Sequence, residues 1–403
     1  MLLGRRTVIT GVGILAANGI GKDAFWKTLL AGASGIGPVT LFDPADLPCR
    51  IAGEVKYFDP HDYVGRRLKP KRMGRFSQLS IAAAGMAFED AGIDLAELQR
   101  IKMLPIIMGV STSAMDLIAH RPMFHTAPNG IPHAAGTAIC TEFDLEARLM
   151  TLSSACASSL DAVVVAAGIV RKGEADLVIA GGADSSIARY TFDAIGQSGM
   201  LSARNDAPEK ASRPFDLERD GGIIAEGAGI VVIENLEHAL SRGRTPYCEV
   251  TGYGSCSDPV GAEEAAGMEK AMTLALANAG LLPNDVDAIS AHGPSDKHLD
   301  RMETDCIKRV FGRRAYALPV CSIKGCTGNP FGTAGIMQVI AGALSIRNQK
   351  IPPTANYERA DPSCDLDYVP RAPRPAKVRN LLINAHGMGR VNSSLMIQEV
   401  DAP

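Results

Sequence analysis

The stretch Thr151-Leu-Ser-Ser-Ala-Cys-Ala-Ser-Ser-Leu160 places Cys156 in a run of small residues, directly before a segment rich in alanine and valine that is typical of a helix. The partial positive charge at a helix N-terminus favours the thiolate form of such a cysteine. The small neighbours would also let a long, thin acyl chain approach. On this segment alone a buried structural cysteine is the commoner outcome, so the hypothesis that Cys156 is a nucleophile depends on the rest of the chain.

Working outward, short apolar strands that end in glycine alternate with alanine-rich helical segments. Examples of such strands are Thr7–Gly11, Leu104–Gly109 and Leu177–Gly182. Continuous apolar runs of this length indicate strands that are buried on both faces, as in a largely parallel sheet covered by helices. The chain is therefore expected to be an α/β protein.

The composition predicts a globular protein of a reducing compartment. The 403 residues are 46% hydrophobic and 21% charged, with a formal net charge of -3. The nine cysteines are odd in number and scattered, which indicates no disulfide framework, and Cys321 with Cys326 has no second pair to complete a zinc site. The first residues run straight into a strand-like segment, and no apolar run reaches membrane-spanning length. We therefore expect a cytoplasmic protein with neither a metal site nor a membrane span.

Two pairs of segments in the chain are similar to each other. Val8-Ile-Thr-Gly-Val-Gly13 is similar to Glu249-Val-Thr-Gly-Tyr-Gly254. A helical segment that ends at Phe88–Ile93 is similar to one that ends at Leu276–Leu281. Chance similarity among segments of small residues is the alternative, but the repeated order favours two similar halves.

This internal similarity also suggests where the halves join. When the alignment of the two halves is extended along the chain, the Cys156 segment corresponds to Cys321–Cys326, and the join falls around Arg242 to Pro246. We therefore predict one domain over residues 1–244 and a second over residues 245–403.

Three other segments carry polar residues at places suited to chemistry. Ala291-His-Gly-Pro294 follows a short strand-like run, so His292 would emerge at a strand's C-terminal edge, where α/β folds place their sites. Ser322–Asn329 is a polar loop, and Asn384–Asn392 is a glycine-rich segment whose backbone amides are free to donate. Taken singly, His292 is as compatible with a hydrogen-bonded strand end as with a catalyst, and Asn329 is compatible with a turn.

Together these segments resemble the beta-ketoacyl-[acyl-carrier-protein] synthase I/II group of the thiolase-fold condensing enzymes. The resemblance covers nearly the whole chain and keeps the order of the pieces. Its most specific motifs are an Arg-Pro-Phe-Asp segment and a late Cys-Asp-Leu-Asp-Tyr-Val-Pro run. The matching stretches are Val8–Gly13, Ser153–Ser159, Ser212–Gly222, Glu226–Gly229, Ala291–Gly293, Ser322–Lys324, Ile351–Asn356 and Cys364–Pro370.

The resemblance implies the architecture. It implies a thiolase-like fold of two duplicated halves, stacked as a five-layer α-β-α-β-α sandwich with the site at their junction. The half over residues 1–244 would carry the nucleophile, and the half over residues 245–403 would carry the histidine and asparagine. The group forms dimers, so a homodimer or a heterodimer with a second synthase-like subunit is expected.

The resemblance also implies the chemistry. Cys156 would take an acyl group from a carrier's thioester, and a malonyl thioester would then lose carbon dioxide to give an enolate. His292 and Asn329 match the side chains that donate to the enolate oxygen, Lys324 matches a supporting lysine, and the amides of Cys156 and Met388 match the oxyanion hole. No cofactor is implied beyond the phosphopantetheine of an acyl carrier protein or coenzyme A that carries the substrates.

The chain departs from the group's pattern around this site. Asn329 stands where the group has histidine, which gives a Cys-His-Asn set, and an amide donates but cannot titrate. His386 and Met388 replace two phenylalanines, so that His386 could act as an added base. Gly222 replaces a residue that is often aromatic, and with Met388 and Ile195 it would shape the substrate pocket.

These departures leave three functions open. The first is a ketosynthase that extends an unusual acyl chain in specialised polyketide or fatty-acid assembly. The second is an acyltransferase that passes the acyl group from Cys156 to an amine or alcohol without decarboxylation. The third is a non-elongating partner of another ketosynthase, which the retained Cys156 disfavours.

A basic segment suggests a partner. Residues 66–75 carry six basic residues in ten, on a protein that is net acidic. A solvated basic face is the default interpretation, and nucleic acid is disfavoured because no stacking aromatic residues accompany the charges. Carrier proteins are acidic, and similar synthases dock them near this position. The residues expected to form the docking surface are Arg66, Arg67, Lys69, Lys71 and Arg72, together with Arg204.

Two other enzyme classes are disfavoured. Gly11-Val-Gly13 after a strand imitates a dinucleotide-binding turn, but no acidic residue follows at the spacing that the ribose requires. Gly196–Met200 fails the Gly-x-Ser-x-Gly pattern of serine hydrolases at its last position.

Overall fold

The computed structural model describes residues 4–65, 67–118, 128–261 and 266–401, and within them two sets of five strands share one design. The first set is β1 (Thr7–Ala16), β5 (Leu104–Gly109), β6 (Ala147–Leu152), β7 (Leu177–Ser185) and β8 (Glu226–Asn235). The second set is β9 (Cys248–Ser257), β10 (Ala288–Ser290), β11 (Val320–Cys321), β14 (Asn380–Gly387) and β15 (Val391–Gln398).

The two sets have the same topology. Their strand orders are β6-β5-β7-β8-β1 and β11-β10-β14-β15-β9. When the five strands of each set are numbered along the chain, both orders read third, second, fourth, fifth and first. In both, the second strand pairs in parallel with the third and fourth, and the last strand pairs antiparallel with the fourth and the first. The predicted α/β fold with two duplicated halves is confirmed, whereas the domain limits at residues 244 and 245 stay a prediction.

The two sets are joined edge to edge. Val8 pairs with Glu249 and Ile9 with Cys248, so that β1 and β9 connect the sets. With β2 (Gly19–Ile20), the ten strands of the two sets form one continuous sheet of eleven. The sequence did not predict this join, because two residue pairs between strands far apart in the chain leave no local signal.

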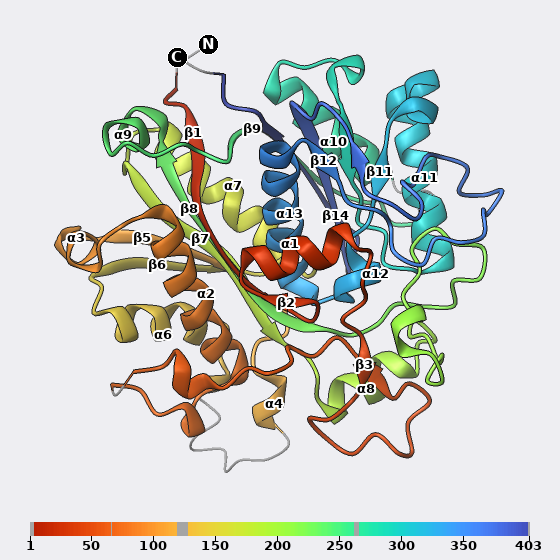
Figure 1. Cartoon of the computed structure of the whole chain (residues 1–403), viewed down its shortest axis with the longest axis horizontal. Helices are drawn as coiled ribbons and strands as arrows, with labels where there is room; N and C mark the ends of the chain where they lie inside the picture. Colours follow the sequence, from red (N-terminus) through yellow and green to blue (C-terminus); the bar gives the residue numbers. More distant parts are fainter. Residues whose placement is uncertain (1–3, 66, 119–127, 262–265, 402–403) are drawn as a thin grey trace.

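Helices form three layers around the strands (Figure 1). The central layer is α7 (Ser158–Arg171) and α13 (Ala334–Asn348), which contact each other between the two sets. Every residue of α13 from Ala334 to Ile346 is buried, as expected of a helix that is apolar on all sides.

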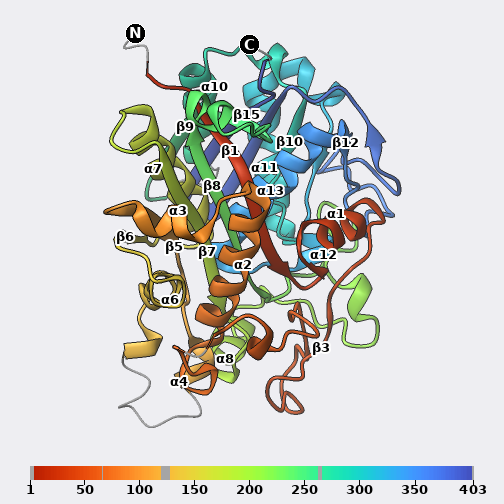
Figure 2. The same ribbon diagram turned by 60° about the vertical axis from the view of Figure 1, so that its left-hand side comes forward.

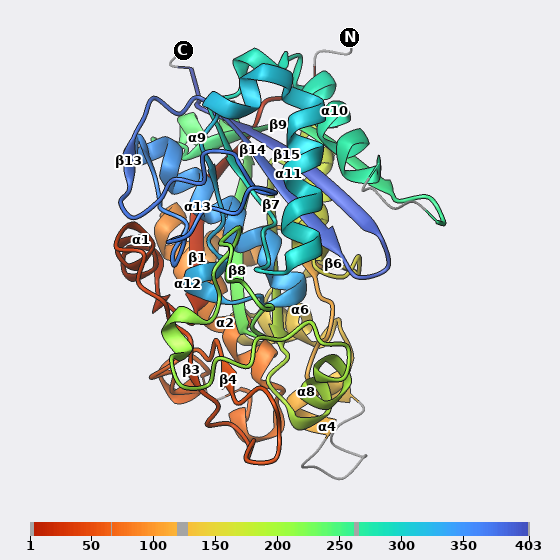
Figure 3. The ribbon, with the colours of Figure 1, turned by 90° about the vertical axis from the view of Figure 1, so that its right-hand side faces the viewer.

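The outer layers cover the remaining faces. On the first set, α2 (Arg75–Ala91) lies across β1 and β8 and packs against α6 (Ala134–Phe143) (Figure 2). On the second set, α10 (Ala266–Ala279) covers β9 and β15, and α11 (Lys297–Phe311) packs beside α10 (Figure 3). The helices and strands thus stack as the predicted five layers.

Glycines in the first strand of each set let a helix approach closely. A Cβ atom on Gly13 of β1 would lie 1.9 Å from the carbonyl oxygen of Ala83 in α2. A Cβ atom on Gly254 of β9 would lie 2.1 Å from the carbonyl oxygen of Ala271 in α10. The repeated Gly-x-Gly pattern therefore serves helix packing in both halves, which agrees with its rejection as a dinucleotide-binding turn.

The remaining elements are short. The other strands are β3 (Gly37–Pro38), β4 (Ile51–Ala52), β12 (Lys350–Ile351) and β13 (Arg374–Pro375). The other helices are α1 (Lys22–Leu30), α3 (Leu95–Arg100), α4 (Met115–Ile118), α8 (Arg189–Gly196), α9 (Leu236–Ser241) and α12 (Lys324–Thr327). Among the described residues, no helix is both long and apolar enough to cross a membrane.

Candidate active site

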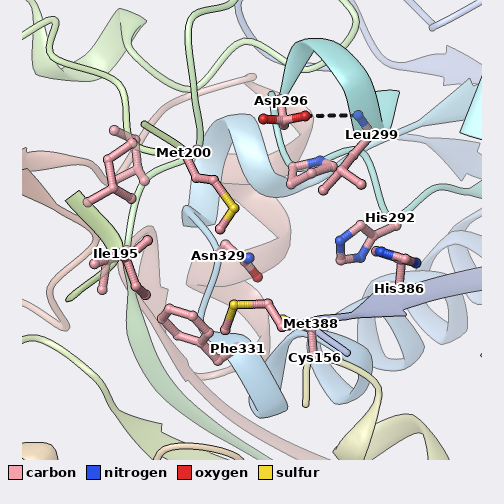
Figure 4. Close-up of a pocket in the computed structure, with 15 residues that line it drawn as sticks. Cys156, Ile195, Met200, His292, Asp296, Leu299, Asn329, Phe331, His386 and Met388 are labelled. Carbon is pink, nitrogen blue, oxygen red and sulfur yellow. Dashed lines mark hydrogen bonds between the residues drawn. The ribbon is translucent and has the colours of Figure 1, made fainter. Parts of the chain in front are cut away.

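A single cavity of about 210 Å³ brings together residues from both halves of the chain (Figure 4). Its walls are mostly apolar, which suits an acyl chain. The residues that the sequence assigned to the site or its pocket and that line this cavity are Cys156, Ile195, Gly222, His292, Asn329, His386 and Met388. Lys324 does not line the cavity.

Cys156 lies in a sharp turn between β6 and α7. Ala155 has a φ of 51°, a left-handed conformation that a residue with a side chain rarely adopts. The turn is held by Ser158, whose hydroxyl accepts from the Ser154 amide at 2.9 Å and donates to the Ala155 carbonyl at 2.6 Å. Asp161 in turn accepts a hydrogen bond from the Ser154 hydroxyl. These contacts hold the backbone of the turn that carries Cys156 at the start of α7.

The protonation state of Cys156 differs from the prediction. The helix N-terminus is present, but burial raises the pKa of the Cys156 thiol above its usual value of 9.0. The charge of Lys324 and a hydrogen bond from the Asn329 side chain lower this pKa, without offsetting the burial. The pKa of Cys156 is therefore not lowered as the helix N-terminus alone predicts, because the loss of solvation outweighs the favourable contacts.

Lys324 lies behind His292 and fixes its tautomer. The Lys324 ammonium donates to the backbone carbonyl of His292 and lies 3.3 Å from its Nδ1 atom. An ammonium group has no lone pair, so Nδ1 accepts and the ring proton is on Nε2. Burial, followed by the charge of Lys324, holds the pKa of His292 well below its usual value. His292 is therefore a neutral ring that can donate from Nε2.

Glu303 on α11 holds the backbone at His292, a role that the sequence analysis missed. Its carboxylate accepts from the amides of His292 at 2.9 Å and Gly293 at 2.8 Å. The Asn384 side chain donates to the same carboxylate at 3.1 Å. The only local signal was an acidic residue in the helix after the His-Gly motif, and its distance of eleven positions hid the contact.

Asn329 and Met388 both donate to the sulfur of Cys156. The side chain of Asn329 and the backbone amide of Met388 each form a hydrogen bond that lowers the pKa of the thiol. The backbone of Asn329 is anchored by its own hydrogen bonds, to the Ile223 carbonyl at 2.8 Å and from the Ala225 amide at 3.1 Å. Its side-chain oxygen is buried and has no partner among the described residues.

His386 lies next to His292 in the cavity wall. Their rings meet edge to face, with centroids 5.9 Å apart. His386 and Met388 are two residues apart at the end of β14, and Figure 4 shows both side chains beside the cavity. Met388 is 49% exposed, so it lies where the cavity opens to solvent.

The basic residues of the expected docking surface do not form one set. Arg66 lies outside the described residues. Arg67 pairs with Asp144 at 3.0 Å, and Arg204 is half-buried and lies 3.5 Å from Asp220. The other three are exposed and form no ion pair within the described part of the chain; they are Lys69, Lys71 and Arg72.

No cluster of three or more metal-ligating side chains occurs among the described residues.

Two protein-family models together match most of the chain. The family "Beta-ketoacyl synthase, N-terminal domain" matches residues 4–239, and the family "Beta-ketoacyl synthase, C-terminal domain" matches residues 247–358. A 3-oxoacyl-[acyl-carrier-protein] synthase 2 from Coxiella burnetii is 35% identical, over 98% of this chain and 99% of the relative.

Solved structures agree with this similarity. The ishigamide ketosynthase/chain length factor superposes with a TM-score of 0.90 and 31% identity, covering 99% of this chain and 100% of that one. A type II polyketide synthase acyl-carrier protein in complex with its hexaketide-bound ketosynthase superposes with a TM-score of 0.88 and 28% identity, covering 98% and 100%.

Proposed function

The chain belongs to the beta-ketoacyl synthase family of acyltransferases, and we propose that it loads an acyl group on Cys156 and condenses it with a malonyl thioester. The observation that supports this best is the convergence of Cys156, His292 and Asn329, from three separate elements, on one apolar cavity. The set contains a nucleophile and two neutral donors, which is what a decarboxylative Claisen condensation requires.

In the loading step, the sulfur of Cys156 attacks the carbonyl carbon of the acyl thioester. The carbon–sulfur bond to Cys156 forms, and the bond to the carrier's sulfur breaks. Negative charge develops on the carbonyl oxygen, and the backbone amides of Cys156 and Met388 are the donors that we assign to it. The apolar walls around Ile195 and Gly222 would hold the acyl chain away from water.

In the condensation step, the malonyl thioester loses carbon dioxide and leaves an enolate. His292 donates from Nε2 and Asn329 from its amide nitrogen, so both stabilise the enolate oxygen without giving up a proton. The enolate carbon then attacks the acyl carbonyl, and the Cys156 thiolate leaves. Lys324 acts through His292, because it keeps Nδ1 occupied and the proton on Nε2.

Substrates carried on an acyl carrier protein fit the charge of the surface. Lys69, Lys71 and Arg72 lie together on an exposed segment, with no acidic partner among the described residues. The similarity to ketosynthases of polyketide and fatty-acid assembly supports a substrate on phosphopantetheine. A dimer, either of two copies or with a chain length factor, is supported by the first of the two solved structures.

The test is a condensation assay with acyl-carrier protein and malonyl-carrier protein. The proposal expects carbon dioxide and a ketoacyl product lengthened by two carbons, and no ketoacyl product with Cys156→Ala. Acylation of Cys156 without loss of carbon dioxide, followed by transfer to an amine or alcohol, would replace the proposal by simple acyl transfer. No acylation by any thioester would replace it by a non-elongating partner role.

A further inference from the structure

His386 is hydrogen-bonded to a residue that lies opposite it in the hairpin of β14 and β15. The pairing register places His386 across from Asn392, and the His386 Nδ1 atom lies 2.7 Å from the Asn392 side-chain oxygen. Asn392 is fully buried. The glycine-rich segment of the sequence forms a tight hairpin here, and the hairpin places the Asn392 side chain against that of His386.

The orientation of the Asn392 amide fixes the tautomer of His386. Its nitrogen donates to the backbone carbonyls of Cys256 at 3.2 Å and Arg390 at 3.4 Å, so its oxygen is the end that faces His386. An amide oxygen only accepts, so Nδ1 of His386 must carry the ring proton. In the neutral ring, Nε2 then has a free lone pair, and no described group donates to it.

The two histidines of the cavity therefore have opposite roles. His292 accepts from Lys324 at Nδ1 and donates from Nε2. His386 donates to Asn392 at Nδ1 and accepts at Nε2. The cavity thus holds one histidine suited to stabilise an oxyanion and one suited to take a proton.

We propose that His386 is the proton acceptor for the Cys156 thiol during loading, and that Asn392 is the positioning residue that keeps its Nε2 unprotonated. This inference rests on the proposed function of Cys156. Asn329 cannot titrate, and His292 uses Nδ1 for Lys324 and Nε2 as a donor. His386 is the remaining imidazole of the cavity, and a buried thiol needs such a base.

His386 also accounts for the proton in the loading step. The Cys156 thiol gives its proton to Nε2 of His386 as the sulfur attacks the thioester. The bond to the carrier's sulfur breaks, and the imidazolium returns the proton to that departing thiolate. The products are the acyl-enzyme and the free carrier thiol, with no further reactant needed.

Titratable groups from several elements lie near His386. Cys156 comes from the start of α7, and His292 meets the ring edge to face from the loop after β10. Lys324 on α12 and Glu303 on α11 lie behind His292.

The kinetic test is single-turnover loading of Cys156 from an acyl-coenzyme A, followed by intact mass. His386→Phe keeps an aromatic ring against His292 but removes the acceptor, and we expect loading to slow by about 100-fold at pH 7. The exposed His298→Phe is the matched control and should load normally. Loading of His386→Phe at the wild-type rate would overturn the inference. Loading of Cys156→Ala would instead overturn the proposed function.

A second measurement reads the tautomer of His386 directly in the wild-type protein. With ¹⁵N-labelled histidine, the ring shifts of His386, assigned by their loss in His386→Phe, should show a protonated Nδ1 and an unprotonated Nε2. Asn392→Ala should lose this pattern and slow loading. A protonated Nε2 in the wild-type protein would contradict the inference.

Discussion

Asn329 gives the cavity a donor whose charge does not change with pH. Its amide nitrogen already contacts the Cys156 sulfur, and its oxygen has no partner among the described residues. An imidazole at this position could also accept a proton, which an amide cannot. At the residue scale, the site therefore separates stabilisation of negative charge, by His292 and Asn329, from proton transfer, which we assign to His386.

Removal of this donor should act mainly on condensation. We expect Asn329→Ala to lower the turnover of condensation by about 100-fold, the usual cost of one lost donor to a developing oxyanion. Asn329→His keeps a donor and should retain most of the turnover. Carbon dioxide release from malonyl-carrier protein measures the step. Wild-type release by the alanine variant would exclude Asn329 from it.

Lys324 should make stability depend on pH. Burial lowers the pKa of its ammonium to about 8, from 10.5 in the unfolded chain. Between these values the unfolded chain binds the proton and the folded chain does not, so the free energy of unfolding rises with pH. Relative to Lys324→Met, the wild type should gain on the order of 3 kcal/mol from pH 8 to 10.5. Denaturant titrations that show no such gain would contradict a buried ammonium.

At the scale of elements, sequence patterns were informative where one segment carries the signal. The strands, the helix after Cys156 and the echoed Gly-x-Gly segments were predictable because apolar runs and small residues are local. The contacts of Glu303 with the His292 backbone were not predictable from spacing alone, since a helix and a loop must first pack together. The same holds for Asn392 and His386, whose contact depends on the register of a hairpin.

The equivalent glycines of β1 and β9 should be equally intolerant of a side chain. Gly13→Ala and Gly254→Ala each force a Cβ atom into a helix carbonyl, so each should lower the free energy of unfolding by about 3 kcal/mol or more. Gly168→Ala in α7 is the control, because its Cβ meets nothing within 4 Å, and it should stabilise by about 0.5–1 kcal/mol. Thermal unfolding of the three variants compares them directly. A neutral Gly13→Ala would show that α2 and β1 are not closely packed.

At the scale of the whole molecule, duplication explains where the cavity lies. The first half supplies the Cys156 turn, and the second supplies His292, Asn329 and His386. The family resemblance predicted this meeting and the residues that make it. It did not predict the raised pKa of Cys156, because a thiol's pKa depends on burial by both halves and not on its own helix.

The exposed cations near the start of α2 should affect carrier-bound substrates only. We expect Lys71→Glu combined with Arg72→Glu to lower kcat/KM for acyl-carrier protein by about tenfold, since charge complementarity speeds association. The same variant should use a small thioester normally. Lys377→Glu, another exposed lysine, is the control. Equal losses with both substrates would argue against a docking surface.

The central claim is that Cys156 carries the acyl group that is extended. Its most direct measurement is the intact mass of the protein after exposure to acyl-carrier protein, with peptide mapping of the adduct and a second reading after malonyl-carrier protein is added. The account predicts one acyl group, located on Cys156, that disappears when the malonyl substrate arrives and reappears in a longer ketoacyl product. An adduct on another residue, or one on Cys156 that the malonyl substrate never removes, would contradict it.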